Sequence, residues 1–84
     1  MTGTKATRER QACLVAFGLS VRRLRQEAGL TQEDLAEASG IHRVTIGLVE
    51  RARREVGVSA VIPLAHALGV DPGELFTQPK KASR

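Results

Sequence analysis

The side chains in this sequence that could do chemistry are mainly cations. Thirteen lysines and arginines stand against nine acids, which gives a formal net charge of +4 and an isoelectric point near 10.2. This balance favours an acidic partner, of which a phosphate backbone is the simplest. Five arginines lie in or beside the helical segments described below: Arg22, Arg23, Arg51, Arg53 and Arg54. The alternative is an ordinary solvated surface, because many basic proteins of this size bind no nucleic acid.

Enzymatic and metal chemistry find no support in the residue pattern. No serine or cysteine stands with a plausible base and orienting acid, and there is no glycine-rich phosphate loop. His42 and His66 stand 24 residues apart without a cysteine or acid at ligand spacing, so we expect no metal and no cofactor. Aromatic residues make up only 2% of the chain, which argues against the stacking platforms that bind RNA or single strands.

Three features missing from the sequence indicate the cellular compartment. Cys13 is the only cysteine, so no internal disulfide can form and a reducing cytoplasm fits best. No apolar run approaches about 18 residues, so we expect no membrane-spanning helix. The polar start of the chain also lacks the apolar region of a signal peptide. We therefore expect a cytoplasmic protein.

The elements that must position the cations are predicted to be helices only. Apolar residues step by three and four from about residue 11, and no segment alternates with the period of a strand. We expect one all-α domain of five helices over 11–76, between a flexible basic arm (1–10) and a flexible basic tail (77–84). The first three helices are predicted at about 11–28, 32–38 and 42–51.

Caps and turn residues set these boundaries. Gly29 suits a left-handed cap that ends the first helix, and Ser39-Gly40 ends the second. Thr31 is a good N-cap, and Asp34 follows three residues later as in a capping box.

The last two helices are predicted to be short. The fourth ends at Gly69, and Pro63 lies inside its apolar segment. Because proline is tolerated best in the first helical turn, we favour a start capped by Ser59 over a longer, kinked helix capped by Gly57. The fifth begins with an Asp71 cap, with proline at its first position.

The spacing between Gln32 and Arg51 predicts a helix-turn-helix unit. Counted from Gln32, the fifth residue is Ala36, which is small enough for a second helix to cross over it. The ninth is Gly40, which can take positive φ and turn the chain within a few residues. Leu35, Ile41, Ile46 and Val49 supply the apolar contacts that fix the crossing angle.

These residues carry a family resemblance. The sequence resembles the phage lambda-type repressor and Cro superfamily, the XRE-like helix-turn-helix domains, in six segments: 17–25, 29–36, 40–43, 50–51, 67–70 and 74–76. The resemblance implies a compact five-helix lambda-repressor-like domain that regulates transcription by binding double-stranded DNA. It also implies a dimer on a palindromic operator. Within the superfamily, residues 42–43, 49–51 and 53–54 look most like restriction–modification controller proteins.

The resemblance assigns a role to each position. It implies that the third helix is the recognition helix in the major groove and that Gln32 touches phosphate. The outward face expected from helical geometry consists of His42, Arg43, Val44, Gly47, Leu48 and Arg51. Arg43 would then pair with a guanine edge, while Val44 and Leu48 would contact thymine methyl groups. The remaining phosphate contacts would come from His42, Thr45, Arg51, Arg53 and Arg54.

The resemblance also implies contacts within and between subunits. Arg25 and Glu50 occupy positions that form an ion pair between the first and third helices, although two solvated charges are the alternative. For the implied dimer, we expect the seam to be formed by the last helix and nearby apolar residues: Val70, Leu75 and Phe76.

Two residues depart from the family pattern. Gly47 lies in the middle of the recognition helix, where it either lets DNA approach closely or is simply tolerated. Ala52 replaces a glycine that is common after the third helix.

A second functional class stays open at this point. Val44 and Leu48 are apolar residues on the expected recognition face. They would suit an antitoxin-like module whose helix-turn-helix mainly contacts a protein partner.

Overall fold

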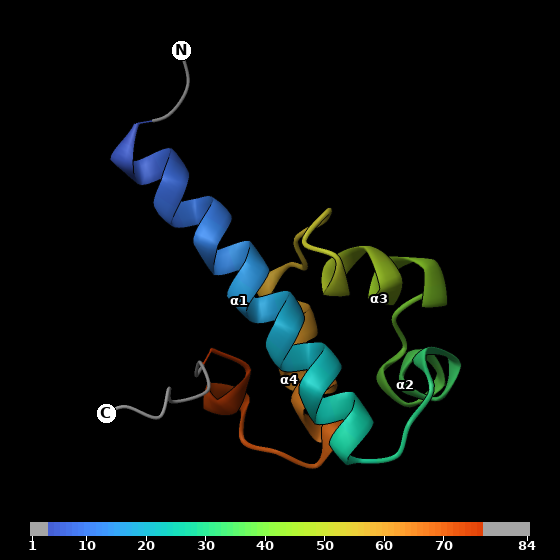
Figure 1. Cartoon of the computed structure of the whole chain (residues 1–84). Helices are drawn as coiled ribbons and strands as arrows, with labels where there is room; N and C mark the ends of the chain where they lie inside the picture. Colours follow the sequence, from blue (N-terminus) through green and yellow to red (C-terminus); the bar gives the residue numbers. More distant parts are fainter. Residues whose placement is uncertain (1–3, 77–84) are drawn as a thin grey trace.

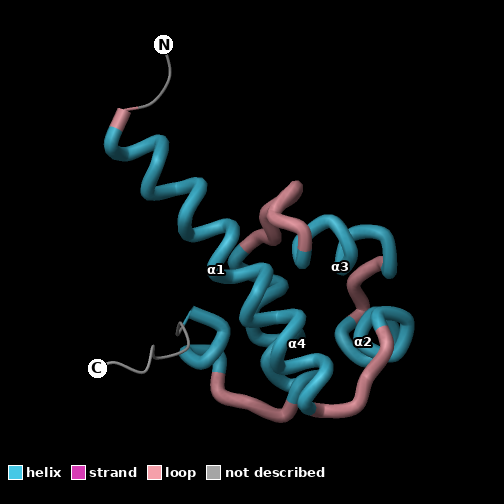
Figure 2. The backbone as a smooth tube through the Cα atoms, in the orientation of Figure 1, coloured by secondary structure: helices cyan, strands magenta, loops and turns pink. Residues whose placement is uncertain are grey.

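The computed structural model describes residues 4–76, which fold into helices without a strand in that range (Figures 1 and 2). The elements are α1 (Lys5–Glu27), α2 (Gln32–Ser39), α3 (Arg43–Glu50), α4 (Val58–Leu68) and the 3₁₀ helix η1 (Pro72–Phe76). The all-α class is confirmed. The count of five α-helices is slightly wrong, because the last element is a single 3₁₀ turn.

One apolar core joins all five elements. α2 packs against α3 and α4, while α3 and η1 both pack against α1. In Figure 1 the long helix α1 crosses in front of α4, and α2 and α3 lie together on one side. The core consists of Val21, Leu24, Leu35, Ile46, Val49, Leu64, Ala65, Leu68 and Leu75. Each helix contributes an apolar stripe, so the relative positions of α2 and α3 are fixed by shared burial.

α1 begins at Lys5, about six residues before the expected start. Thr4 caps it by accepting a hydrogen bond from the backbone N–H of Thr7 (3.1 Å). These first turns are fully exposed, so they have no apolar stripe from which a helix could be predicted. The expected basic arm is therefore helical from Lys5 onward. Residues 1–3 and the expected tail over 77–84 lie outside the described residues.

The start of α4 also corrects the sequence prediction. Gly57, not Ser59, is the N-cap, so Pro63 lies in the second turn of the helix. A proline there leaves the carbonyl of the residue four positions earlier without its helical partner. That residue is Ser59, which is exposed, so water can satisfy the free carbonyl. Within residues 4–76, no helix is long and apolar enough to cross a membrane.

Candidate nucleic-acid interface

α2 and α3 form a helix-turn-helix with a tight glycine turn. Gly40 ends α2 with φ +78°, and its N–H donates to the carbonyl of Ala36. Leu35, Ile46 and Val49 are buried between the two helices and the rest of the core. The left-handed conformation is free of steric cost only for glycine, which explains why the chain reverses here within three residues.

α1 braces this unit by direct contact with the backbone of α3. Gly18 lies against the end of α3, and a Cβ built there would overlap the backbone oxygen of Val49. A Cβ at that position would also lie 3.0 Å from the oxygen of Glu50. Sequence reasoning missed this contact. A glycine inside an apolar helical pattern was the available signal, because it can mark a close approach between backbones.

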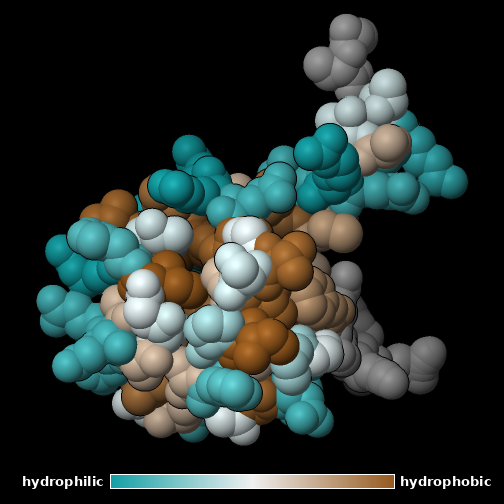
Figure 3. All heavy atoms as spheres, turned by 180° about the vertical axis from the view of Figure 1, so that it is seen from behind, coloured by the Kyte–Doolittle hydropathy of each residue, from teal (hydrophilic) through white to brown (hydrophobic). Residues whose placement is uncertain are grey.

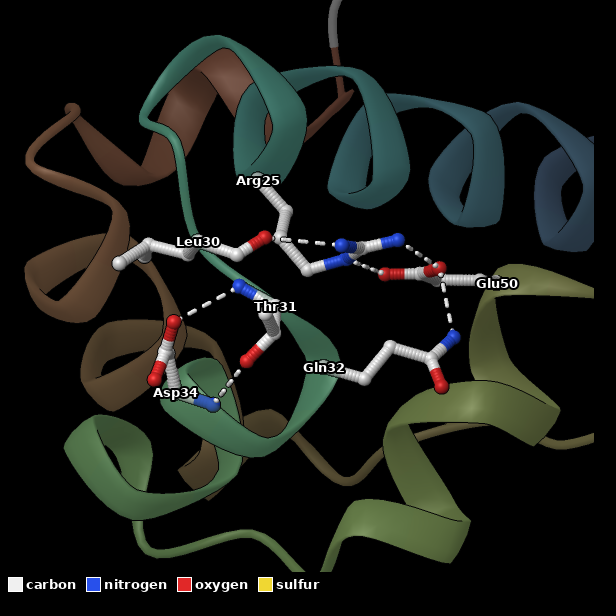
Figure 4. A network of polar contacts seen from close by, with 6 residues as sticks. All are labelled: Arg25, Leu30, Thr31, Gln32, Asp34 and Glu50. Carbon is white, nitrogen blue, oxygen red and sulfur yellow. Dashed lines mark hydrogen bonds and ion pairs between the residues drawn. The ribbon is translucent and has the colours of Figure 1, made fainter.

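A buried ion pair locks α1 to α3. Arg25 Nε donates to Glu50 Oε2 at 2.6 Å, and Arg25 Nη2 donates to Glu50 Oε1 at 3.0 Å (Figure 4). The two side chains are 12% and 3% exposed, so water screens the pair poorly. The hydrogen bond with Glu50 raises the pKa of the Arg25 guanidinium. The ion pair that the family resemblance implied is present.

Gln32 connects the same carboxylate to the start of α2. Its Nε2 donates to Glu50 Oε1 at 3.0 Å, so Glu50 accepts three hydrogen bonds (Figure 4). Arg25 Nη1 also donates to the Leu30 carbonyl at 2.9 Å, which fixes the loop before α2. The first side chain of α2 is therefore held in place by α3 and, through Glu50, by α1.

The N-terminus of α2 is closed by a complete capping box. The Thr31 hydroxyl accepts from the Asp34 N–H, and the Thr31 N–H donates to Asp34 Oδ2, both at 2.9 Å. The hydrogen bond from the Thr31 backbone lowers the pKa of the Asp34 carboxyl. This box was expected from the sequence, and it fixes the residue at which α2 begins.

The exposed part of α3 is smaller than helical geometry predicted. His42, Arg43 and Val44 are exposed, but Thr45 and Leu48 are half-buried. Gly47, expected on the outward face, is buried. A Cβ there would lie 3.4 Å from Arg51 Nη1 and 3.6 Å from Gln32 Oε1, so those two side chains cover it. The surface available to a ligand is therefore mainly the first turn of α3.

Two polar contacts hold that first turn. His42 caps α3, because its Nδ1 accepts from the Val44 N–H at 3.1 Å. The other ring nitrogen, Nε2, is then the donor available to an outside acceptor. Arg43 Nε lies 3.7 Å from Glu33 Oε2, and both side chains are more than half exposed. In the free protein, Arg43 thus lies beside an acid from the first turn of α2.

Three arginines flank a left-handed turn at Ala52, which has φ +59°. The Ala52 N–H donates to the Val49 carbonyl and the Arg53 N–H donates to the Leu48 carbonyl. This pair of bonds is a Schellman cap, which normally has glycine where Ala52 stands. The turn is therefore kept despite the substitution. Arg51, Arg53 and Arg54 are all exposed on it.

The expected dimer residues do not form one surface. Leu75 is fully buried in the core of its own subunit, so assigning it to a seam was wrong. Val70 is half-buried against the same core. Phe76 is 62% exposed, and its ring lies 5.4 Å from that of Phe17 between centroids. Burying Leu75 completes the core where η1 closes it.

Metal-binding groups are not gathered in the described part of the chain. Among residues 4–76, no three histidine, cysteine, aspartate or glutamate side chains lie close enough to hold an ion. The polar contacts described above hold the helices together, and the arginines at the surface remain exposed.

A capped helix, a glycine turn and a second helix held by a buried ion pair define a helix-turn-helix DNA-binding domain. Residues 21–75 match the helix-turn-helix family HTH_3, and the chain belongs to that family. It is a transcription regulator of this family, and the relatives it matches are regulators, not enzymes.

The similar proteins include restriction–modification controllers. Control protein C.SmaI of Serratia marcescens is 48% identical over 59 residues, which is 70% of each chain. The crystal structure of the controller C.AhdI from Aeromonas hydrophila is 48% identical, with a TM-score of 0.75 over 77% of this chain and 98% of that one. The controller C.Esp1396I, solved as a tetramer on its natural 35-base-pair operator, is 30% identical with a TM-score of 0.70, over 76% of this chain and 84% of that one.

Proposed function

We propose that this protein is a sequence-specific regulator that binds a palindromic operator as a homodimer. The observation that carries the proposal is the exposed first turn of α3, which presents Arg43 from a helix-turn-helix braced by the buried Arg25–Glu50 pair. Each subunit places α3 in one major groove, with half-sites about 34 Å apart. The tetramer of C.Esp1396I on a 35-base-pair operator supports this reading, because that relative shares the fold. The protein acts in the cytoplasm, where such DNA lies.

Arg43 is the residue that reads bases. Its guanidinium can donate two hydrogen bonds to O6 and N7 of one guanine, which a lysine could not do with the same geometry. Val44, exposed beside it, contacts a thymine methyl group, and Leu48 extends that contact from its half-buried position.

The phosphate contacts surround this reading turn. His42 donates from Nε2, and Thr45 and Arg51 contact the backbone from the same helix. Arg53 and Arg54 hold the strand that passes the end of α3. Gln32 keeps one amide hydrogen on Glu50 and offers the other to a phosphate at the start of α2.

The first experiment combines selection with a salt titration. Selection of bound duplexes from a random pool yields the operator and its symmetry. On that operator, the logarithm of the affinity should fall linearly with the logarithm of salt, with a slope of about −0.9 per neutralised phosphate. No duplex affinity at low salt would overturn the proposal and leave the second candidate, an antitoxin-like module that presents Val44 to a protein; Val44 is 51% exposed.

Base reading is tested by Arg43→Ala. We expect a loss of about 1–3 kcal/mol confined to particular operator positions, because a bidentate contact to one base is lost. Arg22→Ala removes the same charge from an exposed position on α1 and is the matched control. A uniform loss over all sequences would mean that Arg43 holds only phosphate.

Glu33, the acid beside Arg43, offers a converse test of the role of Arg43. Glu33→Gln removes the carboxylate beside Arg43 in the free protein, so affinity for the operator should rise by up to about fivefold. In an Arg43→Ala background, the rise should shrink to the general effect of removing one negative charge.

A further inference from the structure

An open apolar groove lies beside α1. It has a volume of about 320 Å³ and is bounded by α1, the segment before α4, α4 itself and η1. Its apolar lining consists of Leu14, Phe17, Val56, Val58, Val61 and Phe76. Arg10 and Glu55 stand at its polar rim. No part of the proposed DNA-reading turn lines it.

The groove leaves large apolar side chains in water. Val58 is 87% exposed and Phe76 is 62% exposed, and Ile62, one turn further along α4, is 48% exposed. Figure 3 shows apolar side chains gathered across the rear face of the molecule, below the point where the N-terminal turns of α1 leave the body. Several large apolar side chains exposed around one groove are a feature of interaction sites.

The N-terminal turns of α1 continue the groove beyond the body. Figure 1 shows them projecting from the rest of the fold, and residues 4–13 are all exposed. Ala6, Arg10 and Cys13 precede Leu14 and Phe17 at helical spacing, so they lie on the same stripe of α1 as the groove lining. Such turns gain little stability without packing. The family match starts at residue 21, so they also lie outside the segment shared with the family.

We propose that a second copy of this chain docks on this surface, with the projecting turns of each α1 lying along the groove of the other. The inference deepens the dimer of the proposed function and rests on it. A two-fold dimer needs a self-complementary patch, and this one carries both a cation and an acid on an apolar floor. Arg10 of one copy can meet Glu55 of the other while Phe76 and Val58 become buried.

A nucleic acid suits the surface less well. A phosphate backbone would leave the apolar floor uncovered and would meet Glu55 at the rim. Arg8 and Arg10 on the projecting turns are nevertheless cations that could follow a strand, so the test includes that outcome.

Sedimentation velocity of the full chain without DNA, over a wide concentration range, tests the surface. Val58→Glu places a charge on the groove at the first position of α4, where a carboxylate suits the helix N-terminus and folding is kept. We expect the dissociation constant of the dimer to rise at least about tenfold. Leu19→Glu makes the same change at a 55% exposed site on α1 outside the groove and should leave dissociation unchanged. Equal dissociation constants for the Val58→Glu and Leu19→Glu variants would overturn the proposal, and so would a monomeric unaltered protein.

Arg10→Glu tests the projecting turns in the same way. It should weaken the dimer about tenfold, and adding Glu55→Arg should restore much of the loss, because each reversed cation would again meet an acid across the seam. If Arg10→Glu instead lowers duplex affinity while the dimer is unchanged, the turns contact DNA and their place in the seam is refuted. A dimer without duplex affinity would refute the proposed DNA binding and leave this surface standing, whereas a monomer that binds duplex would refute this surface and the dimer and leave the DNA binding standing.

Discussion

Gln32 and Glu50 join the first residue of α2 to the last residue of α3, with Gln32 Nε2 donating to Glu50 Oε1 at 3.0 Å. The carboxylate of Glu50 is at the same time held by two nitrogens of Arg25. One buried acid therefore sets the position of three helices. The proposed reading turn depends on it, since the turn lies at the other end of the short helix that Glu50 terminates.

The buried pair gives the first prediction. Glu50→Gln should lower the free energy of unfolding by about 3 kcal/mol or more, because it leaves the Arg25 charge without its partner at a 12% exposed site. Urea unfolding followed by circular dichroism measures the loss. Glu27→Gln removes one acid from the exposed Arg23–Glu27 pair and should change stability by less than about 0.5 kcal/mol. Similar losses in the two variants would contradict the bracing role.

Two glycines inside helices should respond in opposite ways to alanine. At Gly47 the new methyl group would meet only the ends of the Arg51 and Gln32 side chains, at 3.4 and 3.6 Å. Those ends can move, so the better helix propensity of alanine should raise stability by about 0.5–1 kcal/mol. Duplex affinity should be largely kept, since contact at those distances leaves Gln32 and Arg51, both proposed phosphate contacts, in place.

Gly18 is the contrasting case. A methyl group there would overlap the backbone of Val49, which cannot move without shifting α3. Gly18→Ala should therefore lower the free energy of unfolding by about 1–3 kcal/mol. Thermal unfolding of the two variants side by side provides the comparison. If Gly47→Ala were also clearly destabilised, the side chains over it would be rigid and the assigned cover would need revision.

These glycines also show how far the sequence could predict the site. The turn glycines Gly29, Gly40 and Gly69 were predictable, because each ends a periodic segment. All three have positive φ in the structure. The burial of Gly47 was not, because it depends on the side chain of Gln32 reaching over from another helix. Helical geometry places a residue on a face of its own helix, but it does not say which neighbour covers that face.

The same limit explains the remaining errors. Leu75 was assigned to a dimer seam as an apolar residue of the last helix, whereas η1 folds back to close the core with it. The start of α1 was missed because periodicity detects packed helix, and the first turns pack on nothing in the subunit. The Arg25–Glu50 pair came from the family resemblance, since a separation of 25 residues gives no local signal.

Ala52 gives the third prediction. Its φ of +59° places an alanine in the left-handed region, at a cost of about 1–2 kcal/mol relative to glycine. Ala52→Gly relieves that strain but makes the unfolded chain more flexible, so the net gain should be about 0.5–1 kcal/mol. Ala38→Gly at an exposed position of α2 should instead lose about 0.5–1 kcal/mol. A loss at both positions, measured by urea unfolding, would mean that Ala52 is not strained.

The capping box of α2 gives the last prediction. The backbone N–H of Thr31 donates to Asp34 Oδ2 at 2.9 Å and lowers the pKa of that carboxyl below its ordinary value of 3.8. Because the pKa is lower in the folded state, the stabilisation is complete above the unfolded pKa and is lost as pH falls through the folded one. Titration of the Asp34 carboxyl carbon by NMR should give a midpoint below 3.8.

Thr31→Ala separates the two hydrogen bonds of that box. It removes the hydroxyl but keeps the backbone N–H, so the pKa of Asp34 should rise only part of the way toward its ordinary value. The variant should also expose the Asp34 N–H to faster hydrogen exchange, because its acceptor is gone. A pKa of Asp34 at its ordinary value in the unaltered protein would mean that the box is open in solution and that α2 begins later than Gln32.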